Sequence, residues 1–73
     1  MSSEKQYSEI VCRIRLLRAK ILIKVVNESL KEAFLNVLNK IGKDADLLHS
    51  EGKLLDSISD RLEMLENEEV FKH

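Results

Sequence analysis

Apolar residues recur at helical spacing near the start of the chain. Steps of four, three, four and four residues separate Ile10, Ile14, Leu17, Ile21 and Val25. This spacing places the five side chains along one face of an α-helix. The stretch 21–26 is also rich in β-branched residues, which favour strands. Because helical spacing flanks that stretch on both sides, the pattern predicts a helix over residues 5–26.

A second apolar set lies on a different side of the same predicted helix. It comprises Cys12, Leu16, Ala19, Ile23 and Val26. A helix that is apolar on two faces lies at the centre of a bundle or is held between chains. An exposed apolar face of this size normally marks a binding surface. We therefore expect this helix to contact more than its own chain.

The residues after this helix predict a break and a new start. Ser29-Leu30-Lys31-Glu32 has the form of a capping box, in which the Ser29 hydroxyl and the Glu32 carboxylate satisfy free backbone N–H groups. A second helix is therefore expected over residues 29–41. Since neither proline nor glycine interrupts residues 27–29, one continuous helix is the alternative.

Two glycines offer two places for the next turn. Gly42 suits the end of a helix and Asp44 suits the start of another, which together predict a turn at 42–44 and a last helix over residues 45–69. The alternative places the turn at 49–53, around Gly52, so that the second helix runs on to His49. In either case the elements are antiparallel helices.

The last predicted helix has the heptad pattern of a coiled coil, with Glu51 at its one polar core position. We expect one domain over residues 1–73 with an all-α fold. It is either an antiparallel helical hairpin or a three-helix bundle, with coiled-coil-like packing. The predicted core comprises Ile10, Ile14, Leu17, Ile21, Val25, Leu30, Phe34, Val37, Ile41, Leu48, Leu55, Ile58, Leu62 and Leu65.

Composition supports this fold class. Hydrophobic residues form 44% of the 73 residues, which argues against intrinsic disorder. The chain has no proline and only two glycines, too few for the turns of a sandwich or barrel. One cysteine excludes an internal disulfide, and residue type alone predicts that Cys12 is a small buried hydrophobic residue.

Charge is distributed unevenly along the chain. Residues 1–27 carry six basic and two acidic groups, and residues 28–73 carry six basic and eleven acidic groups, so a net +4 is followed by a net −5. This predicts that a basic first helix packs on an acidic last helix. The alternative is a basic surface for nucleic acid or anionic lipid, built from Arg13, Arg15, Arg18, Lys20 and Lys24. These five do not share one helix face, and the residues between them are apolar.

The sequence offers little chemistry. Cys12 and His49 are the one nucleophile and base that the fold could bring together, and no spacing suits a metal site or a phosphate-binding loop. We therefore expect no enzyme activity, cofactor or metal. Apolar runs are too short for a transmembrane helix, and residues 1–6 are polar, so we expect a soluble intracellular protein without a membrane span.

These observations favour a non-catalytic protein–protein interaction module. We expect a small helical subunit or adaptor that completes a bundle with itself or with a partner protein, as a homo- or hetero-oligomer. One alternative is a nucleic-acid- or nucleoid-associated regulator that uses segment 13–24. Another is an immunity- or antitoxin-type protein that masks one partner. The candidate interface comprises Ile10, Cys12, Leu16, Ile23, Val26, Leu55, Ile58, Leu62 and Leu65.

Overall fold

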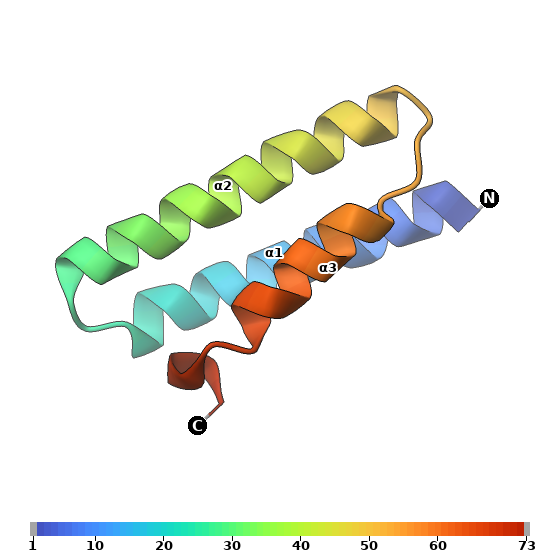
Figure 1. The fold of residues 1–73 in the computed structure, drawn as a ribbon. Coiled ribbons are helices and arrows are strands. Elements are labelled where there is room, and N and C mark those ends of the chain that lie inside the picture. Colours follow the sequence, from blue (N-terminus) through green and yellow to red (C-terminus); the bar gives the residue numbers. More distant parts are fainter. Residues whose placement is uncertain (1, 73) are drawn as a thin grey trace.

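A computed structural model describes residues 2–72 and shows three packed helices (Figure 1). Helix α1 spans Ser2–Lys24, α2 spans Glu28–Ser50 and α3 spans Asp56–Glu66. A short 3₁₀ helix, η1, follows at Glu69–Phe71. Helices α1 and α2 run antiparallel. Helix α3 runs antiparallel to α2 and in the same direction as α1. The described range contains no strand, which confirms the predicted all-α fold as a three-helix bundle; coiled-coil-like packing stays a prediction.

The core is formed by the apolar face of each helix. The α1 face is the one that the sequence predicted, and Leu55, Ile58, Leu62 and Leu65 also lie in the core as expected. The buried hydrophobic residues are Ile10, Ile14, Leu17, Ile21, Val25, Leu38, Ile41, Ala45, Leu55, Ile58, Leu62, Leu65 and Phe71. Burial of these side chains is the main force that holds the three helices together.

The predicted core of α2 needs correction. Leu30 and Val37 are 47% and 49% exposed, whereas Leu38 and Ala45 are fully buried. Leu38, Ile41 and Ala45 follow the three- and four-residue spacing of one helix face, and Val37 lies at the edge of that face. Phe34 and Leu48 are partly buried and pack against the core.

The break between α1 and α2 is confirmed, but its cap is not the predicted one. Asn27 has an extended backbone, and its side chain accepts a hydrogen bond of 3.0 Å from the N–H of Leu30. Glu28 is already helical, so Ser29 lies within the first turn and does not cap it. The capping residue therefore precedes the predicted one by two positions.

The turn predicted at 42–44 is wrong, and the alternative near Gly52 is the observed one. Helix α2 continues to Ser50, and Gly52 then adopts a φ of 72°. The N–H of Lys53 donates to the carbonyl of Leu48 at 2.9 Å, and that of Gly52 donates to the carbonyl of His49 at 3.0 Å. This is a Schellman motif, in which a left-handed glycine ends the helix.

The last predicted helix, 45–69, is therefore divided. Its first part belongs to α2, and its C-terminal part forms α3 and η1. The start of α3 is tied to a distant helix, because Gln6 on α1 accepts from the N–H of Leu55 at 2.9 Å and donates to Asp56 at 2.6 Å. Phe71 of η1 packs on Phe34 of α2, with ring centroids 5.3 Å apart.

Candidate functional site

The most distinctive surface of the molecule is the side of α1 that faces solvent. We define the outer face of α1 as Cys12, Leu16, Ala19 and Ile23, together with Val26, which lies two residues beyond the end of the helix. All five are exposed, and Leu16, Ile23 and Val26 are exposed by 65%, 79% and 87%. The spacing of four, three and four places the four helical residues opposite the buried face, and Val26 follows in the turn after the helix. A continuous apolar strip of this kind is unusual on a protein that has no partner.

Two basic residues flank the outer face. Arg15 lies on the side of α2, where it lines a shallow groove with Asn39 and Lys43. Lys20 follows Arg13 by two helical turns, which places it on the side of α3. Arg15 and Lys20 are exposed, and neither forms an ion pair or hydrogen bond with another residue in the range 4–72. Their charges are therefore available to a partner.

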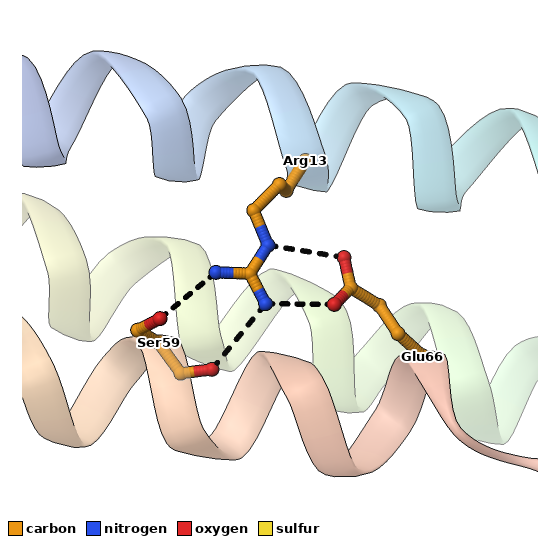
Figure 2. Close-up of polar contacts among 3 residues, drawn as sticks. All are labelled: Arg13, Ser59 and Glu66. Carbon is orange, nitrogen blue, oxygen red and sulfur yellow. Dashed lines mark hydrogen bonds and ion pairs between the residues drawn. The ribbon is translucent and has the colours of Figure 1, made fainter.

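Arg13 binds residues of α3 within the same chain (Figure 2). Its guanidinium points from α1 toward α3 and donates to both carboxylate oxygens of Glu66, at 3.1 and 2.7 Å. It also donates to the hydroxyl and the carbonyl of Ser59, at 2.8 and 3.5 Å. The hydrogen bond with Glu66 raises the pKa of Arg13, although burial acts in the opposite direction. This contact is of the kind expected for a basic first helix packed on an acidic last helix.

The other basic residues of segment 13–24 point in different directions. Arg18 faces α2 and donates to the side-chain oxygen of Asn39 at 3.0 Å. Lys24 is half-buried at the end of α1 and has a contact of its own. Arg13, Arg15, Arg18, Lys20 and Lys24 therefore do not form one cationic surface, since Arg13 is directed to α3 and Arg18 to α2.

The candidate interface residues separate into two groups. The structure places Ile10, Leu55, Ile58, Leu62 and Leu65 in the core, each at most 8% exposed, because α3 folds back onto α1 within the same chain. They are therefore not surface residues of the folded bundle. Cys12, Leu16, Ile23 and Val26 are exposed and form most of the outer face.

The two residues considered for nucleophilic chemistry lie on different sides of α1. Cys12 is exposed, contrary to the expectation from its residue type, because its helical position is on the outer face. His49 stacks on Tyr7 where α1 meets α2, with ring centroids 4.0 Å apart and planes at 6°. The Tyr7 hydroxyl donates to Asp46, and this hydrogen bond raises the pKa of Tyr7. The arrangement joins two helices and holds His49 away from Cys12.

Sequence reasoning missed this polar contact and the groove beside it. The groove runs between α1 and α2 and is lined by residues that include Tyr7, Arg15, Arg18, Lys43 and Asp46. These residues are far apart in sequence, and no local motif joins them. Within the described range no three His, Cys, Asp or Glu side chains are grouped so that they could hold a metal ion. Over the same range no helix has the length and apolarity needed to cross a membrane.

Comparison of the chain with protein-family models, with curated proteins and with solved structures finds no match in any of the three.

Proposed function

We propose that this protein is a non-catalytic interaction module, a small helical subunit or adaptor that binds another protein through the outer face of α1. The observation that carries the proposal is the exposure of that face, with Leu16, Ile23 and Val26 at 65%, 79% and 87%. Packing these side chains against a partner removes apolar surface from water, which favours association.

The fold itself does not need the outer face. Every residue of the opposite face of α1, from Ile10 to Val25, is buried against α2, α3 and η1. Four further apolar residues on the same helix, and Val26 beyond its end, therefore add nothing to the core of the single chain. A small chain that keeps a second apolar face is typical of one that works in an assembly.

The separation of the basic residues gives less support to nucleic-acid binding. Phosphate binding needs several free cations on one surface, whereas Arg13 is held by Glu66 and Arg18 by Asn39. An exposed apolar face of this kind is equally compatible with a stable subunit of an assembly and with a protein that masks one partner. Both are protein–protein interactions, and in both the protein acts inside the cell, where an exposed thiol such as that of Cys12 persists.

The proposal is tested by placing a photo-crosslinking amino acid at Leu16 in the native cells. Lys40 is the matched control position, because it is exposed on α2 and forms no hydrogen bond or ion pair with another residue in the range 4–72. We expect a discrete crosslinked product from position 16 and none from position 40. Adding Ile23→Gln and Val26→Gln to the same chain should abolish the product while the circular dichroism melt stays unchanged. Equal crosslinking at both positions, or a product that survives these substitutions, would overturn the proposal.

A further inference from the structure

We propose that the partner segment on the outer face of α1 is an α-helix of another protein whose apolar seam is flanked by acidic residues. This inference rests on the proposed function and specifies the partner of the same surface. It follows from the spacing of the outer face, from the charges beside it and from the pairing that those charges disfavour.

The spacing of the outer face suits a helix. Cys12, Leu16, Ala19, Ile23 and Val26 alternate steps of four and three residues, the average of 3.5 that defines a coiled-coil seam. At 1.5 Å per residue the helical part of the seam, from Cys12 to Ile23, is about 17 Å long, or roughly three helical turns. The small side chains of Cys12 and Ala19 alternate with the larger Leu16 and Ile23, which leaves room for large residues of a facing helix.

The charges beside the seam indicate which residue types flank the seam of the partner helix. Arg15 directly precedes Leu16, and Lys20 directly follows Ala19, so they occupy the two positions that border the seam of a coiled coil. Both are exposed without a partner in the described range. Lys43, on the far side of the adjoining groove, adds a further positive charge beyond Arg15. Acidic residues on the facing helix complement this arrangement.

The same charges disfavour a second copy of this chain as the occupant. In a parallel pair of α1 helices, Arg15 of one copy lies against Lys20 of the other on both sides of the seam. In an antiparallel pair centred on Ala19, the two Lys20 side chains come together. Like charges at these positions oppose association. A partner with acidic flanks removes this repulsion, so we infer a heteromeric contact.

Cys12 provides a direct readout, because it is the single cysteine, it is exposed and it lies in the seam. The experiment measures the rate at which iodoacetamide alkylates Cys12 in the intact chain, followed by mass spectrometry. Two cysteine-free synthetic peptides are compared, each about three heptads long with leucine in the seam. One carries glutamate at the flanking positions and the other carries lysine.

The glutamate peptide at about nine times its Kd should slow alkylation about tenfold, because the site is then occupied about nine-tenths of the time. The lysine peptide should bind at least about tenfold more weakly, and added salt should narrow the difference. The double variant Arg15→Glu, Lys20→Glu should reverse the preference. The matched variant Lys40→Glu, which changes an exposed charge on α2, should leave the preference unchanged.

The other outcomes separate the two proposals. Equal protection by both peptides would overturn the acidic partner and leave helix binding by the outer face intact. Protection by neither would overturn the proposed function as well. Protection that increases with the concentration of the protein alone would identify a second copy as the occupant and overturn the heteromeric contact. Protection by anionic vesicles or duplex DNA, with none from the glutamate peptide, would also overturn it.

Discussion

Arg13 and Glu66 are joined by two hydrogen bonds, at 3.1 and 2.7 Å, although 53 residues separate them in the chain. The pair connects the middle of α1 to the last residue of α3. The side chains are 30% and 31% exposed, so water screens the pair only in part. This geometry, with Ser59 as a further acceptor, makes it the most extensive polar contact between these two helices.

The first prediction concerns this pair. Arg13→Ala should lower the free energy of unfolding by about 1 kcal/mol, because a two-pronged charged contact is lost at a partly exposed site. Urea denaturation followed by circular dichroism measures the change. Glu51→Gln is the control, since the Lys53–Glu51 pair spans 3.2 Å with side chains 64% and 44% exposed and should contribute almost nothing. Equal effects of the two substitutions would contradict the prediction.

The second prediction contrasts two apolar residues of α3. Ile58 is 1% exposed and Met64 is 73% exposed. Ile58→Asp should unfold the bundle or remove several kcal/mol of stability, because a carboxylate without a partner would enter the core. Met64→Asp should change stability by less than about 0.5 kcal/mol. Thermal melts of both variants test this, and a cooperative melt of Ile58→Asp at the wild-type temperature would exclude the observed packing.

The third prediction tests the start of α2. Asn27→Ala should cost about 1 kcal/mol, because the side-chain oxygen that accepts from the Leu30 N–H is removed. Ser29→Ala should be close to neutral, since Ser29 lies within the helix. Chemical denaturation of the two variants distinguishes the observed cap from the one that the sequence suggested. A larger loss from Ser29→Ala would restore the capping box.

The fourth prediction is that substitution by alanine changes the stability of the protein in opposite directions at the two glycines. Gly52 has a φ of 72°, so Gly52→Ala should destabilise the protein by about 1 kcal/mol. Gly42 lies inside α2, and a Cβ there would sit 3.9 Å from Cδ1 of Ile14, an ordinary contact distance. Gly42→Ala should therefore stabilise the protein by about 0.5–1 kcal/mol, since alanine favours the helix. Denaturation midpoints measure both changes, and loss of stability in Gly42→Ala would show that the contact with Ile14 is tighter.

The fifth prediction concerns alkaline pH. Tyr7 is the only tyrosine and the chain has no tryptophan, so absorbance reports its ionisation alone. The hydrogen bond to Asp46 raises the pKa of Tyr7, with burial and the Asp46 charge acting in the same direction. The contribution to stability is thus complete below the ordinary pKa of tyrosine, about 10. It is lost as the pH rises through the higher pKa of the folded state.

Titration of the folded chain should therefore show Tyr7 ionising at higher pH than in urea. Asp46→Ala should move the pKa back toward the ordinary value, whereas Asp60→Ala, an exposed carboxylate on α3, should have no effect. Identical titration curves in the folded and unfolded chain would show that the Tyr7–Asp46 contact does not persist in solution.

The sequence predicted α1 well because its inner face depends on local spacing alone. It misplaced the second turn because Gly42 and Asp44 resemble the end of one helix and the start of the next. In the structure both residues lie inside α2 and make contacts with other helices. Gly42 lies near Ile14 of α1, and Asp44 accepts from Arg61 of α3 at 2.8 Å. The heptad pattern hid the true turn, because Leu48 and Leu55 are seven residues apart on either side of it.

The candidate site was predicted only in part, because local spacing identifies a helix face but not the contacts between helices. The spacing of Cys12 and its neighbours identified the second face of α1, yet residue type suggested burial for Cys12, and angular position decided otherwise. The charge asymmetry anticipated a contact such as Arg13 with Glu66. No local signal pointed to the hydrogen bond between Gln6 and Leu55 or to the stacking of Tyr7 on His49, because each joins residues more than forty positions apart.

The two apolar faces of α1 give the collapsing chain two ways to build its interior. Rolling the helix by half a turn would bring Leu16 and Ile23 inward and carry Arg13 away from Glu66. The bulkier residues of the inner face favour the native arrangement, and the contacts of Arg13 and Arg18 are formed only there. The polar contacts between helices and the burial of apolar side chains thus favour the same arrangement. A chain that lost those contacts would fold on a more frustrated landscape, on which its own binding surface competes for the core.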